Sequence, residues 1–349
     1  SIQIIPMVAQ QAGHLTVFQR RANWAAPLNN GRISAEEMAS IRARYDEIFA
    51  ACAVSPAAFE HIPDSRRFHD VPPAERRAFY DRLYDEPGFG IWLANFAEIF
   101  IDEQANAEIS AYIADRIRQR VKDPKIAEQL IPKDHGFGIQ RLPLETNYFE
   151  TYNRDNVELV NSKATPIERI TATGLRTSER EFEFDIIVYA TGFDAFTGAY
   201  DRIDIRGVGG QKLRDKWADG PVTYLGMLVS GFPNMVMLGG PQTAAANFPR
   251  GSEIAVEWIT PLLDHMRAGG NTRFDAKPEA EQAWCEAVKA TYQGLLMSKA
   301  QSWITGYNSN LDGHEYGHTR YNIFATGGVE YAKHLRAAAE GGYRGIAFS

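Results

Sequence analysis

The chain has 349 residues, of which 44% are hydrophobic and 23% charged, a balance typical of globular proteins with apolar material for two or three domains. Its 37 basic and 44 acidic residues give a net charge of −7, which excludes the basic excess expected of a protein that binds nucleic acid or an anionic membrane. Two cysteines, Cys52 and Cys285, cannot form a disulfide framework, so we expect a cytoplasmic protein.

The first predicted elements are a helix over 1–9 and a strand at Leu15-Thr16-Val17-Phe18, which is followed by Arg20-Arg21. A helix, a short turn, a strand and then a basic residue form the second half of a βαβ dinucleotide-binding unit. The first half of such a unit is a strand with a glycine-rich loop, and it would precede Ser1. We therefore expect a chain that is truncated at its N-terminal side.

Helical patterns fill the next hundred residues. Ser34-Ala35-Glu36-Glu37 fits a capping box before a helix that reaches about Ala53. A second helix is predicted from Pro72 to about Leu83, and a third over Asn106–Lys122. The segment 34–130 is thus predicted as a helical insertion in an α/β chain.

Strand patterns return at 156–160, 167–170 and 181–189. The last of these leads into Ala190, so that the run Asp185–Ala190 is β-branched in its centre and stops at Thr191-Gly192. Such a run is typical of a buried strand in a parallel sheet, where ligands bind beyond the carboxyl ends of the strands. We therefore expect a buried strand whose end approaches a cofactor.

The last third of the chain combines short apolar runs with helices. Tyr224–Val229 and Met235–Leu238 are predicted as two buried strands separated by the turn Gly231-Phe232-Pro233-Asn234. Helices are predicted over Ser252–Met266 and from Pro278 to about Leu296.

Arg20 and Arg21 are candidate phosphate ligands. The residue at the end of the second strand of a dinucleotide-binding unit meets the adenosine ribose, and a guanidinium there pairs with the 2′-phosphate of NADP. The alternative is a pair of solvated surface arginines.

Two further side chains are candidates for chemistry. Arg141 lies in the Gly- and Pro-flanked loop Phe137–Pro143, where a cation could stabilise an anion that develops during a reaction. Trp303 precedes a glycine turn and could cover a planar cofactor. A structural salt bridge and a core tryptophan are the respective alternatives.

His314-Glu315-Tyr316-Gly317-His318 matches the H-E-x-x-H pattern of zinc proteases. That chemistry needs both histidines on one face of a helix, and Gly317 and the preceding Asp312-Gly313 disfavour a helix here. We expect a solvated or cofactor-adjacent loop and no metal site.

Taken in order, these segments resemble the flavin-dependent Baeyer–Villiger monooxygenases of the phenylacetone and cyclohexanone monooxygenase type. The matching motifs run nearly from end to end of the chain. They are Leu15–Arg20 with Asn23-Trp24, Tyr148–Val157, Ala190-Thr191-Gly192-Phe193-Asp194-Ala195, Asp204-Ile205-Arg206-Gly207, Lys216-Trp217, Gly231-Phe232-Pro233-Asn234, Val256-Glu257-Trp258 and Ser302-Trp303.

The resemblance implies an α/β fold with two Rossmann-like dinucleotide-binding domains, both incomplete at the N-terminal side, and a helical insertion. Residues 1–33 would begin the NADP-binding domain without its glycine-rich loop, and 34–130 would be the insertion. Residues 131–190 would complete the NADP-binding domain, and 191–349 would form the C-terminal part of the FAD-binding domain.

The resemblance also implies the reaction. FAD and NADP(H) would be the cofactors, and a C4a-peroxyflavin would insert one oxygen of O2 next to the carbonyl of a small ketone to give an ester or lactone. Partners would be the ketone and O2, with no nucleic acid and no membrane, in a monomer or small homo-oligomer. The alternatives are a sulfur- or nitrogen-oxygenating flavin monooxygenase and an inactive nucleotide-binding fragment.

Matching positions imply the site residues. Arg141 would be the catalytic arginine. The cofactor-binding residues would be Arg20, Arg21, Gln140, Thr191, Gly192, Trp303, Gly240 and Pro241. The substrate pocket would be lined by Gln242, Thr243, Ala244, Ala245, Asn247 and Phe248. The family often has Lys at position 140 and Thr at position 21, so Gln140 could weaken a nicotinamide-side contact and Arg21 could strengthen phosphate binding.

Overall fold

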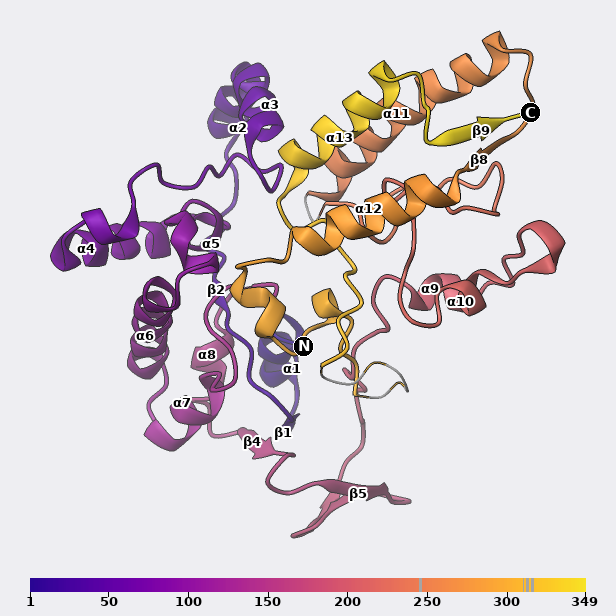
Figure 1. Ribbon diagram of the computed structural model, residues 1–349. Helices are drawn as coiled ribbons and strands as arrows, with labels where there is room; N and C mark the ends of the chain where they lie inside the picture. The colour runs from indigo at the N-terminus through magenta and orange to yellow at the C-terminus, as the bar shows by residue number, and fades with distance from the viewer. Residues whose placement is uncertain (245–246, 310, 312–313, 315–316) are drawn as a thin grey trace. The chain divides into compact units, whose positions relative to one another are not determined.

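The computed structural model describes residues 1–244, 247–309, 311, 314 and 317–349, which form two compact units (Figure 1). The first unit contains Ser1–Arg32 and Pro63–Gly192. The second contains Ile33–Ile62 and Phe193–Ser349. No helix among the described residues is long and apolar enough to cross a membrane.

Two short parallel strand pairs organise the first unit. Helix α1 (Ile4–Gln11) leads into β1 (Leu15–Gln19), which pairs in parallel with β4 (Val157–Asn161). The strand β2 (Ala26–Pro27) pairs in parallel with β3 (Leu144–Glu145). These pairings confirm the predicted helix and strand at the start of the chain and the predicted strand at 156–160.

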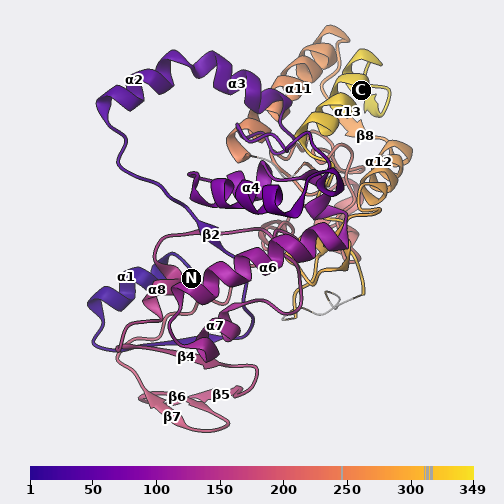
Figure 2. The same ribbon diagram turned by 90° about the vertical axis from the view of Figure 1, so that its left-hand side faces the viewer.

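Most of the chain between the paired strands of the first unit is helical (Figures 1 and 2). Its helices are η1 (Phe68–Asp70), α4 (Pro73–Asp85), α5 (Gly90–Leu93), η2 (Ala97–Phe100), α6 (Glu103–Arg120), α7 (Pro124–Leu130) and α8 (Tyr148–Thr151). Helix α6 buries Ile109, Ile113 and Ile117, which confirms its predicted apolar face. Asp102 caps α6 through the backbone N–H of Ala105.

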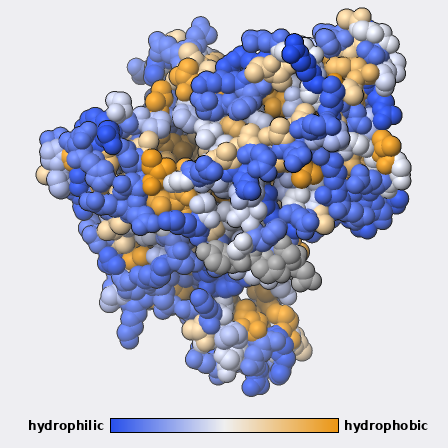
Figure 3. Space-filling view, viewed as in Figure 1, coloured by the Kyte–Doolittle hydropathy of each residue, from blue (hydrophilic) through white to orange (hydrophobic). Residues whose placement is uncertain are grey.

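A three-stranded antiparallel sheet follows β4. Its strands are β5 (Ile167–Ile170), β6 (Gly174–Thr177) and β7 (Glu181–Glu183), in the order β5-β6-β7 (Figure 2). The ring of Phe182 packs edge-on against Phe18 of β1, with 5.1 Å between ring centroids. Hydrophobic side chains reach the surface of the lobe that carries β5 (Figure 3).

The predicted buried strand at Asp185–Ala190 is wrong. Strand β7 ends at Glu183, and the residues that follow form no strand and lie on the surface. The exposed fractions of Ile186, Tyr189 and Phe193 are 80%, 70% and 98%. A strand forms only where neighbouring strands accept its hydrogen bonds, and none of the described residues supplies such a neighbour to this run.

The second unit is mainly helical. Its helices are α2 (Ala35–Ala43), α3 (Tyr45–Val54), α9 (Gly198–Asp201), η3 (Val208–Gly210), α10 (Leu213–Lys216), α11 (Phe248–Ala268), α12 (Pro278–Ala290), η4 (Leu296–Lys299), η5 (Trp303–Thr305) and α13 (Gly328–Glu340). Strands β8 (Phe274–Ala276) and β9 (Ile346–Phe348) pair antiparallel. Its largest core cluster includes Trp258 and Trp284, and Trp284 stacks on Phe324 with 5.2 Å between ring centroids.

Helices α2 and α3 belong to the second unit, whereas α4 to α7 belong to the first. The predicted capping box at the start of α2 is confirmed. Ser34 Oγ accepts from Glu37 N at 3.1 Å, and Glu37 Oε2 accepts from Ser34 N at 2.7 Å.

The two buried strands predicted around residue 231 are also wrong. Most apolar side chains of the first run and Met237 of the second are buried, whereas Leu238 is 55% exposed, and the backbone of the first run turns instead of extending. Leu225 and Gly226 have φ values of +57° and +70°, and Tyr224 N donates to Leu228 O at 2.7 Å. A short hydrophobic run predicts that a segment is buried but does not determine its backbone conformation, and here the buried segment forms a tight turn.

Candidate functional site

Arg20 and Arg21 follow directly after β1, as the sequence predicted. Arg20 is exposed. Arg21 is half-buried, and its Nη2 lies 2.6 Å from Asp134 Oδ2. The end of a parallel strand therefore presents two cations, and Arg21 is paired with a carboxylate.

A hydrogen-bonded bridge joins this strand end to the loop that carries Arg141. Asp134 Oδ1 lies 2.7 Å from His135 Nδ1, and His135 Nε2 lies 3.1 Å from Asn23 Oδ1. Asn23 Nδ2 then donates to the carbonyl oxygen of Arg141 at 3.4 Å. A series of polar contacts thus links the Arg21 side chain to the backbone of Arg141.

Burial affects the pKa values of His135 and Asp134, the two titratable groups of this hydrogen-bonded bridge. The His135 side chain is only 2% exposed. Burial lowers the pKa of its imidazole, and Asp134 offsets part of that effect. Burial acts to raise the pKa of Asp134, but the hydrogen bond to His135 and the charge of Arg21 outweigh it, so this pKa lies below its ordinary value.

Arg141 is exposed on a rigid loop. Phe137 is fully buried, and its N–H donates to Ser110 Oγ at 2.9 Å. Gly138 has a φ of +72°, and its carbonyl accepts from Trp92 Nε1 at 3.1 Å. No ion pair of the Arg141 guanidinium occurs among the described residues, so the structural salt bridge considered as an alternative is not found there. Its neighbour Gln140 is half-buried.

A buried ion-pair network supports the chain just after this loop. Arg120, the last residue of α6, contacts Glu145 Oε1 at 2.7 Å and Glu150 Oε1 at 2.5 Å. The Glu145 side chain is fully buried, and its other oxygen accepts from Tyr148 N at 2.8 Å. This network ties β3 and α8 to the end of α6.

Thr191 and Gly192 are exposed at the end of the first unit. Gly192 has a φ of +94°, a conformation that favours glycine, and a Cβ at this position would contact nothing within 4 Å. No turn is assigned at Thr191 and Gly192, and the expected approach of a strand end to a cofactor is not tested by the described residues.

In the second unit, Gly240 and Pro241 are buried and lead into a clamped residue, Gln242. Gln242 is 2% exposed and has a φ of +67°. Its Oε1 accepts from Thr223 N at 3.2 Å and from Thr223 Oγ1 at 2.7 Å, and its Nε2 donates to Pro221 O at 2.8 Å. Both the oxygen and the nitrogen of the Gln242 side-chain amide therefore form hydrogen bonds within the protein.

The rest of the predicted substrate loop is also anchored through its backbone. Phe324 N donates to Thr243 O at 2.9 Å, and Ala244 forms a parallel bridge with Phe324. Asn247 N donates to Ala57 O at 2.9 Å. Phe248 begins α11 and is 77% exposed. The predicted pocket residue Ala245 lies outside the described residues.

Trp303 is half-exposed, and its ring lies 5.4 Å from that of Phe196. Its carbonyl accepts from Asn322 Nδ2 at 2.9 Å, and the backbone carbonyl of Asn322 accepts from Gln242 N at 2.7 Å. Asn322 thus joins Trp303 to the predicted substrate loop. Sequence reasoning missed Asn322, although a polar residue before the buried pair Ile323-Phe324 was a usable signal.

The H-E-x-x-H segment is not helical where the structure describes it. His314 Nδ1 lies 2.9 Å from Gly306 O, and His318 Nε2 lies 3.1 Å from Asp219 O. Glu315 and Tyr316 lie outside the described residues. Each imidazole therefore contacts a backbone carbonyl oxygen through one of its ring nitrogens.

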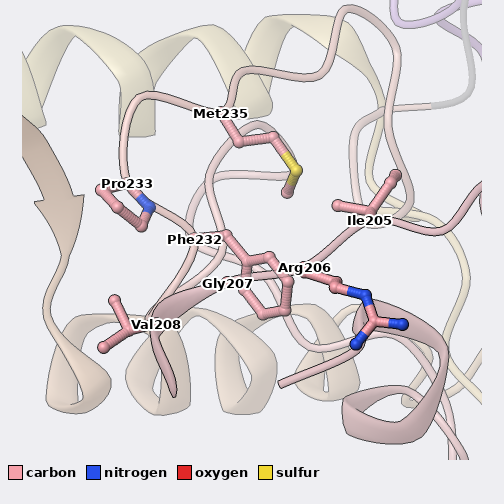
Figure 4. A pocket seen from close by; sticks show the side chains of 7 residues that line it. All are labelled: Ile205, Arg206, Gly207, Val208, Phe232, Pro233 and Met235. Atoms are coloured by element: carbon pink, nitrogen blue, oxygen red, sulfur yellow. The ribbon is translucent and has the colours of Figure 1, made fainter. Parts of the chain in front are cut away.

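A pocket of about 330 Å³ opens in the second unit, apart from the predicted site residues. Figure 4 shows the ring of Phe232 among the lining side chains, with the Arg206 guanidinium directed away from Val208 and Pro233. The Arg206 side chain contacts Asp204 at 3.0 Å. The pocket is lined by Ile205, Arg206, Gly207, Val208, Phe232, Pro233 and Met235.

Known proteins match the chain over its whole length. A 2-oxo-Δ3-4,5,5-trimethylcyclopentenylacetyl-CoA monooxygenase of Pseudomonas putida is 42% identical over 99% of the chain and 63% of the relative. An acetone monooxygenase (methyl acetate-forming) of Gordonia sp. is 37% identical over 100% of the chain and 65% of the relative. A Baeyer–Villiger monooxygenase of Pseudooceanicola batsensis is 36% identical over 99% of the chain and 62% of the relative.

A solved structure agrees with these relatives. The crystal structure of OTEMO in complex with FAD and NADP superposes with a TM-score of 0.94 at 41% identity, covering 100% of the chain and 64% of that protein. The chain thus spans less than two thirds of the length of the curated relatives it matches. No protein-family model matches the chain.

Proposed function

We propose a function for this chain on the premise that it is homologous to the Baeyer–Villiger monooxygenases over its whole length. It is the larger part of a flavoprotein that uses NADPH and O2 to insert one oxygen atom next to a ketone carbonyl, giving an ester or lactone. The observation that carries the proposal is the 42% identity over 99% of the chain.

The first unit contains the binding site for NADPH. Arg20 extends from the end of a parallel strand and is exposed, which suits a guanidinium that pairs with a 2′-phosphate. Residues 1–33 and 131–190 belong to this NADP-binding domain. In the second unit, Trp303 has a half-exposed ring that can cover a planar cofactor group.

Arg141 stabilises negative charge that develops on the reacting oxygen atoms. A donor serves this purpose best when it is fixed before the reaction, because no free energy is then spent on reorganising it. The contacts of Phe137 and Gly138 and the hydrogen bond from Asn23 fix the backbone of the loop. The guanidinium remains exposed for substrate.

Bound FAD would supply the redox chemistry, taking two electrons from NADPH and activating O2. Residues 191–349 form the C-terminal part of the FAD-binding domain, to which Gly240 and Pro241 contribute.

The run at 185–193 is exposed in the structure, although its apolar composition is typical of a strand covered on both faces. The relatives have more than a third of their length beyond the matched region. Small ketones and O2 are the partners of the protein. Its location is the cytoplasm, as its two free cysteines suggest.

The test is ketone-stimulated oxidation of NADPH by the holoenzyme in air, with gas chromatography for the ester or lactone. We expect oxidation that requires O2 and yields one ester per NADPH consumed. Arg141→Ala should abolish ester formation while NADPH still binds. Oxidation that no ketone accelerates, with no ester formed across a panel of linear and cyclic ketones, would overturn the proposal.

A further inference from the structure

Trp303 projects from a segment that is otherwise buried. Its side chain belongs to a residue that is 38% exposed, whereas Ser302 and Ile304 on either side of it are 4% and 6% exposed. Ser302 Oγ accepts from Ile304 N at 3.1 Å and so caps the short helix η5. The turn is therefore fixed, and it presents the indole ring of Trp303 with one flat apolar face open to a ligand.

Phe196 contacts the ring of Trp303 from the other part of the second unit. The two ring centroids lie 5.4 Å apart, with an angle of 40° between the ring planes. Phe196 has a φ of +61°, a left-handed conformation that is unfavourable for an aromatic residue, and Thr197 after it is buried. The fold thus keeps Phe196 against Trp303 although the backbone is strained there.

Asn322 holds the backbone of the same tryptophan. It is 3% exposed, and its Nδ2 donates to Trp303 O at 2.9 Å. The position of Asn322 is itself fixed, because its carbonyl accepts from Gln242 N at 2.7 Å and the next residue, Ile323, donates to Tyr292 Oη at 3.2 Å.

The other atom of the Asn322 amide is not satisfied. Its Oδ1 is buried and accepts no hydrogen bond from the described residues. A buried acceptor without a donor lowers the stability of a fold. A leucine of similar size would avoid this loss, but it cannot donate to the carbonyl of Trp303.

Two features that oppose folding therefore converge on one exposed ring. Strained backbone and unsatisfied buried polar atoms persist at functional sites, where the surrounding structure holds them in place. We propose that Phe196 and Asn322 are positioning residues for Trp303, which hold its indole ring in one orientation before NADP(H) binds. A ring that is already ordered loses less conformational entropy when the ligand covers it. This inference rests on the proposed role of Trp303 in cofactor binding.

The test measures the dissociation constant of NADP⁺ for the holoenzyme by titration calorimetry. Phe196→Leu removes the aromatic ring, and Asn322→Leu removes the amide while keeping its volume. Each should weaken NADP⁺ binding by about three- to tenfold, because lost positioning removes at most what an aromatic contact contributes. Trp303→Ala should weaken binding at least as much as either variant. In the Trp303→Ala background, Phe196→Leu and Asn322→Leu should each change the affinity by less than about twofold.

Tyr200→Leu is the matched control. Tyr200 is half-buried in the same unit, and its ring lies 5.6 Å from that of another tryptophan, Trp217, which is 2% exposed. The control removes an aromatic contact with a tryptophan that is not open to a ligand, so it should leave the NADP⁺ affinity within about twofold of wild type.

A weaker affinity in Trp303→Ala with an unchanged affinity in Phe196→Leu would overturn the role of Phe196, and the same result in Asn322→Leu would overturn that of Asn322. An equal loss in the Trp303→Ala background would show that either residue acts by general destabilisation, which also contradicts the proposal. If Asn322→Leu does not fold, Phe196→Leu decides the point. A wild-type affinity in Trp303→Ala would instead contradict the proposed cofactor role of Trp303.

Discussion

Substitution of Gln242 by Ala tests how the predicted substrate loop is held. Its side chain makes three hydrogen bonds, two to Thr223 and one to Pro221, and Thr223 is fully buried. Each bond contributes about 1 kcal/mol, and buried groups left without partners cost about 1–3 kcal/mol each. We expect Gln242→Ala to lower the free energy of unfolding by about 3 kcal/mol.

A companion substitution separates the hydrogen bonds from backbone strain. Gln242 has a φ of +67°, a conformation that costs a non-glycine residue about 1 kcal/mol. Gln242→Gly loses the same hydrogen bonds but relieves this strain, so it should be about 1 kcal/mol more stable than Gln242→Ala. Gln293 is exposed, and Gln293→Ala should change stability by less than about 0.5 kcal/mol.

The assay is urea unfolding of the holoenzyme followed by tryptophan fluorescence, with the ketone KM measured in parallel. The looser loop should raise the KM of Gln242→Ala for ketone more than its KM for NADPH. A stability of Gln242→Ala within about 0.5 kcal/mol of wild type would refute the assigned hydrogen bonds.

Three further predictions concern the first unit. Arg120→Met should cost about 3–5 kcal/mol in denaturant unfolding, because it leaves the buried Glu145 carboxylate without its cation, and a loss below about 1 kcal/mol would contradict this. Arg20→Ala should reduce the ratio of NADPH to NADH turnover at least tenfold, and an unchanged ratio would refute its phosphate role. Hydrogen bonds from Arg118 and Lys133 lower the pKa of Glu128 to about 2. The ionised Glu128 carboxylate therefore stabilises the fold fully at pH values above the ordinary pKa of a glutamate, and this contribution is lost as the pH falls through about 2. Acid unfolding of Glu128→Gln should therefore be less steep between about pH 5 and pH 2 than that of wild type, and identical slopes would contradict the pairing.

Local signals in the sequence predicted the helices well. The capping box at Ser34 and the proline at the start of α4 act within one turn of helix, so each is readable without the tertiary structure. The parallel strand β1 and the position of Arg20 after it followed from a motif that spans only a few residues.

Features that depend on distant neighbours were not predictable in this way. The run at 185–190 has the composition of a buried strand, but whether it pairs depends on strands elsewhere. The sequence shows that Gln242 has an amide but not that Thr223 would donate hydrogen bonds to its oxygen. Likewise, Asp134 contacts Arg21, and Asn23 contacts the backbone of Arg141. The members of each pair are far apart in the sequence, so local patterns do not show that they meet.

The proposed function is the transfer of one atom of O2 to a ketone. The most direct measurement is turnover of a cyclic ketone with NADPH under ¹⁸O2, followed by mass spectrometry of the product. We expect a lactone that carries one ¹⁸O atom in its ring and whose formation requires Arg141. NADPH oxidation that yields only hydrogen peroxide, or a product whose new oxygen comes from water, would contradict it.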